Sequence, residues 1–159
     1  MREDRRPSFQ LSFVSAEAEM PVPTASEVLG RVRSVAPWDE ASICPEQADF
    51  PRVHISWHSS AGFNVHCFED EESLGQFLVT GRDFSPPSVE INLGGQTLER
   101  WPCELFVAEP LAIEALEHFL DNARLNPALC WVRTGDFPRE TLWESREQRE
   151  AWERTHRTL

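Results

Sequence analysis

The stretch from Arg52 to Phe68 reads RVHISWHSSAGFNVHCF, and its alternation decides the predicted fold. Apolar residues occupy every second position on both sides of the small segment SSAG: Val53, Ile55, Trp57, Phe63, Val65 and Cys67. A period of two is typical of half-buried β-strands, because successive side chains point to opposite faces. Small, turn-forming residues between two such runs predict an antiparallel hairpin.

Weaker patterns surround this hairpin. Residues 8–14 alternate and predict a first strand, and a short helix capped by Thr24 or Ser26 is expected to follow it. Residues 35–51 contain prolines and little periodicity, which predicts an irregular connection. Three further apolar runs predict short strands, at 76–80, 89–93 and 105–108, and a final strand is expected to begin at residues 129–131.

The longest helical pattern runs from Pro110 to Leu125. Proline is tolerated in a first helical turn, and Pro127 is expected to end the helix. The buried stripe follows the helical repeat: Ala112, Leu116, Phe119 and Ala123, widened by Ile113 and Leu120.

These elements predict an α+β fold, an antiparallel or mixed β-sheet with helices packed mainly on one face, because strands and helices do not alternate regularly. At 159 residues the chain fits one domain over 1–159. We expect residues 1–7 to be frayed and residues 144–159 to form a peripheral terminal helix.

The charge balance limits the classes of partner. The formal net charge is -12, and the excess lies within residues 8–143. Such a field repels nucleic acid and anionic membrane surfaces, whose binding needs clustered cations, and it attracts a basic protein. The alternative is that the charge serves solubility alone.

The spacing of the four cysteines indicates the cellular compartment in which the protein folds. Cys44, Cys67, Cys103 and Cys130 lie far apart, with no CxxC pair, which favours free buried thiols over the alternative of two disulfides. No apolar leader and no apolar run of about 20 residues is found, so we expect a cytoplasmic protein without a membrane partner.

Catalytic motifs for nucleotides, zinc or a serine nucleophile do not occur. The strongest enzymatic hypothesis is a metal site formed by His54, His58 and His66 of the hairpin beside Glu69 and Asp70. Alternation places these histidines on the solvent face, and ligand sets usually lie in concave pockets. We therefore expect no catalytic residue, no metal, no cofactor and no enzyme activity.

The candidate partner-binding residues are acidic or aromatic. Glu69, Asp70, Glu71 and Glu72 form a run of four carboxylates, with a solvated loop or the start of a helix as the alternative interpretation. Trp101 lies between Arg100 and Pro102 in a turn-rich stretch, where an exposed indole is typical of an interface anchor and packing under a loop is the alternative. Asp83 completes this set of candidates.

Residues 52–133 resemble the Imm1 family of immunity proteins from bacterial polymorphic toxin systems. The similarity lies in the strand hairpin, the turn at Gly94-Gly95, the strand Leu105-Phe106-Val107, the helix LAIEALEHFL at 111–120 and the segment PALCW at 127–131. The first fifty residues and the terminal helix do not match. The resemblance implies a protein that is encoded beside a toxin and binds it, and family members of this kind block nucleic-acid deaminase toxins.

The resemblance and the charge together predict an immunity protein that neutralises a cognate toxin by occluding its basic active-site surface. The resemblance supplies no catalytic residues. Two alternatives remain open at this point, a small metal-dependent enzyme that uses the hairpin histidines and a non-catalytic adaptor subunit.

Overall fold

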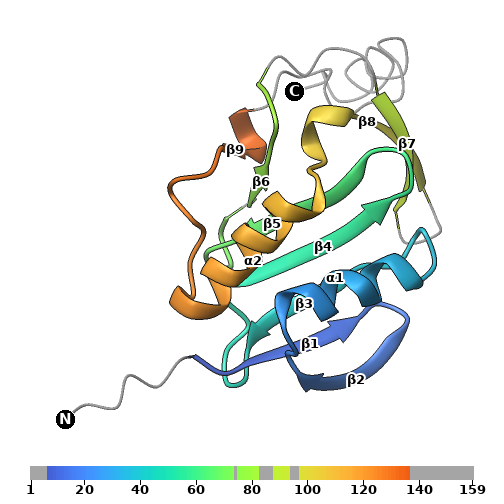
Figure 1. Cartoon of the computed structure of the whole chain (residues 1–159). Coiled ribbons are helices and arrows are strands. Elements are labelled where there is room, and N and C mark those ends of the chain that lie inside the picture. The colour runs from blue at the N-terminus through green and yellow to red at the C-terminus, as the bar shows by residue number, and fades with distance from the viewer. Residues whose placement is uncertain (1–6, 74, 83–87, 94–96, 137–159) are drawn as a thin grey trace, which may run out of the picture.

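A computed structural model describes residues 7–73, 75–82, 88–93 and 97–136 (Figure 1). Its main feature is a seven-stranded sheet in the order β2-β1-β3-β4-β5-β6-β9, in which every neighbouring pair is antiparallel. The strands are β1 (Phe9–Phe13), β2 (Ala16–Pro21), β3 (Ala41–Pro45), β4 (Arg52–His58), β5 (Gly62–Phe68), β6 (Gln76–Leu78) and β9 (Trp131–Arg133). A separate antiparallel pair consists of β7 (Ser88–Leu93) and β8 (Thr97–Pro102).

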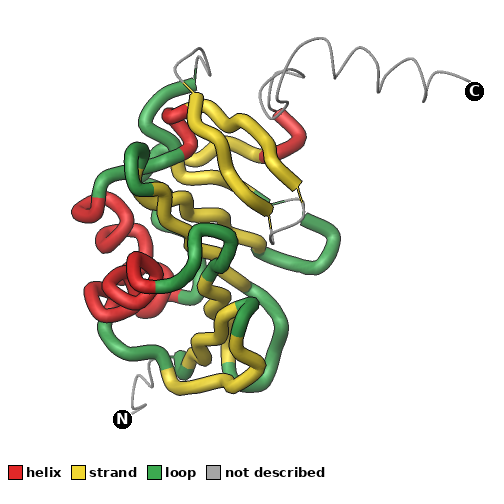
Figure 2. The backbone as a smooth tube through the Cα atoms, turned by 90° about the vertical axis from the view of Figure 1, so that its right-hand side faces the viewer, coloured by secondary structure: helices red, strands yellow, loops and turns green. Residues whose placement is uncertain are grey.

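The two α-helices, α1 (Ala25–Ser34) and α2 (Glu109–Asn122), lie side by side on one face of the large sheet (Figures 1 and 2). Short 3-10 turns cover Cys103–Leu105 and Thr134–Asp136. The predicted α+β class with helices on one face is therefore confirmed. Among the described residues, no helix has the length and apolar character needed to cross a membrane.

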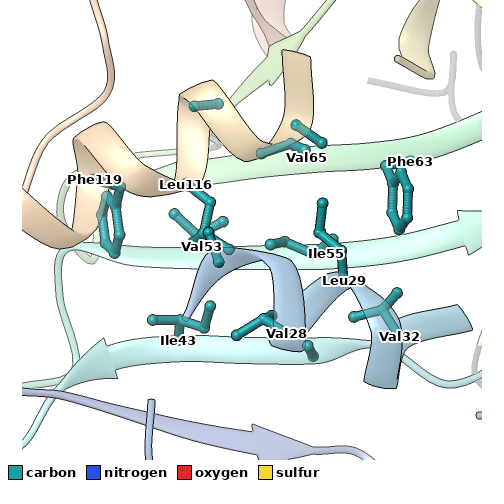
Figure 3. Packing of buried hydrophobic residues seen from close by; sticks show 14 of the residues in the cluster. Val28, Leu29, Val32, Ile43, Val53, Ile55, Phe63, Val65, Leu116 and Phe119 are labelled. Carbon is teal, nitrogen blue, oxygen red and sulfur yellow. The ribbon is translucent and has the colours of Figure 1, made fainter. Parts of the chain in front are cut away.

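The core lies between the helices and the sheet. Val53, Ile55 and Val65 point from β4 and β5 toward the helices, as the alternation predicts (Figure 3). From the opposite side, α1 contributes Val28, Leu29 and Val32, and α2 contributes Leu116 and Phe119. Each fully buried side chain of this size stabilises the fold by about 1.5–3 kcal/mol.

The helix ends follow from local chemistry. The Thr24 side chain accepts a hydrogen bond from the Glu27 N–H at 3.3 Å, which confirms one of the two predicted caps of α1. Helix α2 begins with Pro110 in its first turn and stops at Asn122, earlier than the predicted Leu125. The reason is that Ala123 adopts a left-handed conformation, and its N–H closes the last turn onto the Phe119 carbonyl.

Several elements differ from the prediction. The segment 35–51 is not wholly irregular, because β3 lies within it and pairs with β1 and β4. Strands β2 and β8 were not predicted. The strand predicted at 105–108 is not formed, because Leu105 ends the 3-10 turn Cys103–Leu105 and Val107 makes a single bridge to Phe63. Partners elsewhere in the chain stabilise β3 and the Val107 bridge, and local periodicity does not reveal such partners. The predicted terminal helix at 144–159 and the turn at Gly94-Gly95 lie outside the described residues.

The β7–β8 hairpin packs against the face of the sheet that the helices leave uncovered. A second apolar cluster forms there from Phe77, Val79, Leu105, Phe106 and Val132. Val89, Ile91 and Trp101 of the hairpin pack against this cluster. The polar side of β4 and β5 is consequently half-buried, whereas the sequence predicted a solvent face.

Candidate functional site

A pocket of about 490 Å³ opens on the half-buried polar face of β4 and β5. Its lining comes from segments far apart in the sequence: the loop before β3, strands β4 and β5, and the β7–β8 hairpin. The residues that carry the argument below are Trp38, Asp39, Glu40, Trp57, Asn92 and Trp101. A concave site of this volume has the size of a typical ligand or side-chain binding site.

Polar side chains join the outer face of β4 and β5 to the elements packed on it. Asn64 is 5% exposed, and its Nδ2 donates to the Leu105 carbonyl at 2.8 Å. His58 accepts the Ser60 N–H at Nδ1 (3.2 Å), so the proton lies on Nε2, which donates to the Glu90 carbonyl at 3.1 Å. The His58 bond joins β7 to the large sheet, and the Asn64 bond joins the 3-10 turn Cys103–Leu105 to β5.

The acidic wall of the pocket is formed by Asp39 and Glu40. Asp39 is only 3% exposed, and its carboxylate accepts hydrogen bonds from the Ser15 N–H at 3.2 Å, from the Ser15 hydroxyl and from the Glu40 N–H at 2.9 Å. Burial, and then the charge of Asp39, raise the pKa of Glu40 above its ordinary value. The two neighbouring carboxylates therefore form a region of unfavourable negative charge that a cation would stabilise.

His54 does not neutralise this charge at neutral pH. Its Nδ1 lies 3.4 Å from Glu40 Oε1, which is the distance of an ion pair if the imidazole is protonated. However, burial and then the charge of Arg52 lower the pKa of His54 to about 4. The ring is therefore uncharged near pH 7, and the close approach to Glu40 is not an ion pair there.

The three hairpin histidines do not converge on a common point. His54 and His66 are opposite each other in the β4–β5 ladder, but the Phe68 ring lies against both, at 5.2 and 4.2 Å between ring centroids. His66 also stacks on Phe77 at 3.8 Å. Within the described part of the chain, no group of three or more His, Cys, Asp or Glu side chains has the arrangement of a metal site. The geometry thus gives the hypothesis of a histidine metal site no support.

The predicted carboxylate run forms an exposed loop between β5 and β6. Asp70 Oδ1 accepts the N–H groups of Glu72 (3.0 Å) and Ser73 (2.8 Å), and Glu69 Oε1 accepts from Gln76 Nε2 at 3.4 Å. Asp70 therefore shapes the loop, while Glu71 and Glu72 extend into solvent. None of the four lines the pocket, and Asp83 lies outside the described residues.

Trp101 lies on β8, opposite Val89, and not in a turn as predicted. It is partly buried, its ring meets Phe77 edge-on at 5.5 Å, and its Nε1 donates to Glu99 Oε2 at 2.9 Å. The residue both packs against the second apolar cluster and lines the pocket. Of the described residues predicted to bind a partner, Trp101 is the one that the pocket contains.

Sequence reasoning missed Trp38, Asp39, Glu40 and Asn92 as residues of the pocket. Trp38 and Glu40 lie in the segment that was predicted to be irregular. The only local sign of a site there is that a tryptophan and two carboxylates, Trp38, Asp39 and Glu40, are consecutive in the sequence. Asn92 carries a side-chain oxygen that is buried without a hydrogen-bond partner. No sequence pattern could have marked this atom, because its surroundings come from the packing of β7 on the large sheet.

The thiols take no part in this site. All four cysteines are free, as predicted, and the alternative of two disulfides is wrong. The expected burial is found only for Cys67, because Cys44 and Cys103 are partly buried and Cys130 is exposed. Cys67 is 1% exposed, and burial, followed by the charge of Glu69, raises its pKa to about 12. A thiol with such a pKa is unreactive at neutral pH, in agreement with the predicted core position.

No protein-family model matches the sequence, and no curated protein matches it.

Proposed function

We propose that this chain is an immunity protein that binds a cognate bacterial toxin and occludes the toxin's basic active-site surface. The observation that carries the proposal is the pocket, whose lining includes Trp38, Trp57 and Trp101 together with Asp39 and Glu40. Tryptophans that line a recess are typical anchors of protein interfaces. A net charge of -12 favours fast association with a basic protein.

The resemblance of residues 52–133 to the Imm1 family supports the same function. It favours a nucleic-acid deaminase as the toxin, since such an enzyme needs a cationic cleft for its polyanionic substrate. An acidic protein seated on that cleft excludes the substrate by charge as well as by volume. The proposed place of action is the cytoplasm of the producing cell, where the four free thiols stay reduced.

The test uses the toxin domain encoded beside the gene for this chain. Expressed alone, the toxin is expected to stop growth, and co-expression with this chain is expected to restore growth and to give a 1:1 complex on size-exclusion chromatography. Substrate turnover by the purified toxin should fall as the chain is added. A neighbouring toxin that keeps full activity at saturating concentrations of the chain would overturn the proposal.

A further inference from the structure

Three apolar side chains in the lining of the pocket belong to neither core of the protein. Trp38 and Val35 are partly buried, yet within the described part of the chain neither is a member of the two apolar clusters or packs against them. Val14 is 61% exposed, the largest exposure of a large hydrophobic side chain among the described residues. All three line the pocket, and we call them the Trp38 patch. An apolar patch at a recess that folding does not use is typical of an interaction surface.

Hydrogen bonds hold the Trp38 patch in place without a partner. The carboxylate of the buried Asp39, the residue after Trp38, accepts the Ser15 N–H at 3.2 Å and the Ser15 hydroxyl. The Val14 N–H donates to the Glu40 carbonyl at 3.3 Å. Val14 and Trp38 therefore come from two segments, the turn after β1 and the loop before β3, that are bonded to each other. A surface that is already ordered loses less conformational freedom when it binds.

The charges around the patch select the kind of partner. Among its described residues, the pocket lining contains the carboxylates of Asp39, Glu40 and Glu90, and no Lys or Arg. Glu90 is exposed, and Glu40 is partly exposed. Because the whole chain carries a net charge of -12, a second copy of it would be repelled. The partner that fits is a protein with basic residues beside the side chain that enters the pocket.

The volume of the pocket, about 490 Å³, selects a large side chain, because a small aliphatic one would leave most of that space unfilled. Aromatic side chains bury about 150–250 Å² each and dominate the energetics of protein interfaces. We infer that the Trp38 patch and the pocket receive an aromatic side chain of the partner protein, flanked by basic residues. This inference rests on the proposed function, because it takes the toxin as that partner.

The first experiment needs no toxin and uses three peptides as probes. The first is acetyl-Arg-Arg-Phe-Arg-Arg-amide, the second has Ala in place of Phe, and the third has Glu in place of each Arg. Binding to the full chain is measured by tryptophan fluorescence and by the NMR shift of the Trp38 indole N–H. We expect the first peptide to bind at least about tenfold more tightly than either of the others. Equal binding of the Phe and Ala peptides, or of the Arg and Glu peptides, would overturn the inference.

Variants locate the binding. Trp38→Ala is expected to weaken the first peptide by about tenfold, and Val14→Ser by about fivefold. Met20→Ser is the matched control for Val14→Ser, because Met20 is the other exposed large hydrophobic residue, at 36%, and does not line the pocket. Both serine variants should keep the urea midpoint of the wild type, and Met20→Ser should change binding less than twofold. Equal weakening by Val14→Ser and Met20→Ser would remove the patch from the binding site.

The same variants, tested against the neighbouring toxin, separate this inference from the proposed function. If wild type, Val14→Ser and Trp38→Ala protect cells and bind the toxin equally, the Trp38 patch is wrong and the immunity function stands. If the wild type fails to bind the toxin while the first peptide still binds at the patch, the proposed function fails and the aromatic site stands. A weaker toxin complex with Val14→Ser, but not with Met20→Ser, supports both. A dimer of the chain in sedimentation that Val14→Ser dissociates would assign the patch to a second copy and overturn the inference.

Discussion

His58 Nε2 donates to the backbone carbonyl of Glu90 at 3.1 Å, and this bond links the outer face of the large sheet to the β7–β8 hairpin. Thirty-two residues separate the two partners along the chain. The Ser60 N–H donates to Nδ1 of the same ring and thereby holds the imidazole in place. Because both His58 and the neighbouring β7 residues line the pocket, the bond helps to define its shape.

We expect His58→Ala to loosen the β7–β8 hairpin without unfolding the sheet. The loss is about 1 kcal/mol, the net value of a single hydrogen bond. Hydrogen exchange should speed up in β7 and β8 while β4 and β5 remain protected. Ser60→Ala, which leaves the bond to Glu90 in place, is the control. Unchanged exchange in β7 of the His58 variant would contradict this role.

A buried amide holds the 3-10 turn against β5. Asn64 Nδ2 donates to the Leu105 carbonyl at 2.8 Å, and Asn64→Leu would leave that carbonyl buried without its partner. We expect the free energy of unfolding to fall by about 1–3 kcal/mol. Asn122→Leu is the matched control, because the Asn122 amide lies at the exposed end of α2. Urea unfolding of this control should give a free energy of unfolding within about 0.5 kcal/mol of the wild-type value.

The stability of the protein is expected to fall on mild acidification because of His54. Its folded pKa is lowered from 6.5 to about 4, so between these values the unfolded chain binds a proton that the folded protein does not. The stabilisation is present above pH 6.5 and is lost as the pH falls toward 4. Glu40, whose pKa is raised, opposes this change, since its folded form takes up a proton more readily.

The comparison with His54→Gln isolates the histidine. Between pH 6.5 and pH 4 the wild type should lose more stability than the variant, by up to about 3 kcal/mol, because each pKa unit corresponds to 1.36 kcal/mol. Urea titrations at half-unit pH steps would measure this difference. Parallel curves for the two proteins would show that His54 titrates normally in the folded state.

The exposed carboxylate loop remains a predicted contributor to association. Glu71→Arg with Glu72→Arg spares Asp70, which the loop needs for its turn. We expect this double variant to slow association with the toxin by about tenfold at low salt and to flatten the salt dependence. Glu114→Arg with Glu117→Arg makes the same change in net charge on α2. Equal association rates for the two double variants would remove the loop from the interface.

The sequence by itself determined the parts of the fold that depend on local periodicity. The β4–β5 hairpin, the buried stripe of α2, the Thr24 cap and the unreactive position of Cys67 all follow from residues close together in the chain. Alternation of period two or 3.6 assigns each side chain to a face, and burial of the apolar face then follows from the hydrophobic effect.

Only the tertiary structure decided what covers the other face of the sheet. The Ser15–Asp39, His58–Glu90 and Asn64–Leu105 contacts join residues 24, 32 and 41 positions apart. Such contacts depend on how separate elements pack, and no repeat in the sequence predicts them. This is why the sequence did not predict the pocket, the burial of Glu40, or the position of Trp101 between the second apolar cluster and the pocket. Periodicity describes one element at a time, whereas a recess between elements exists only once they are assembled.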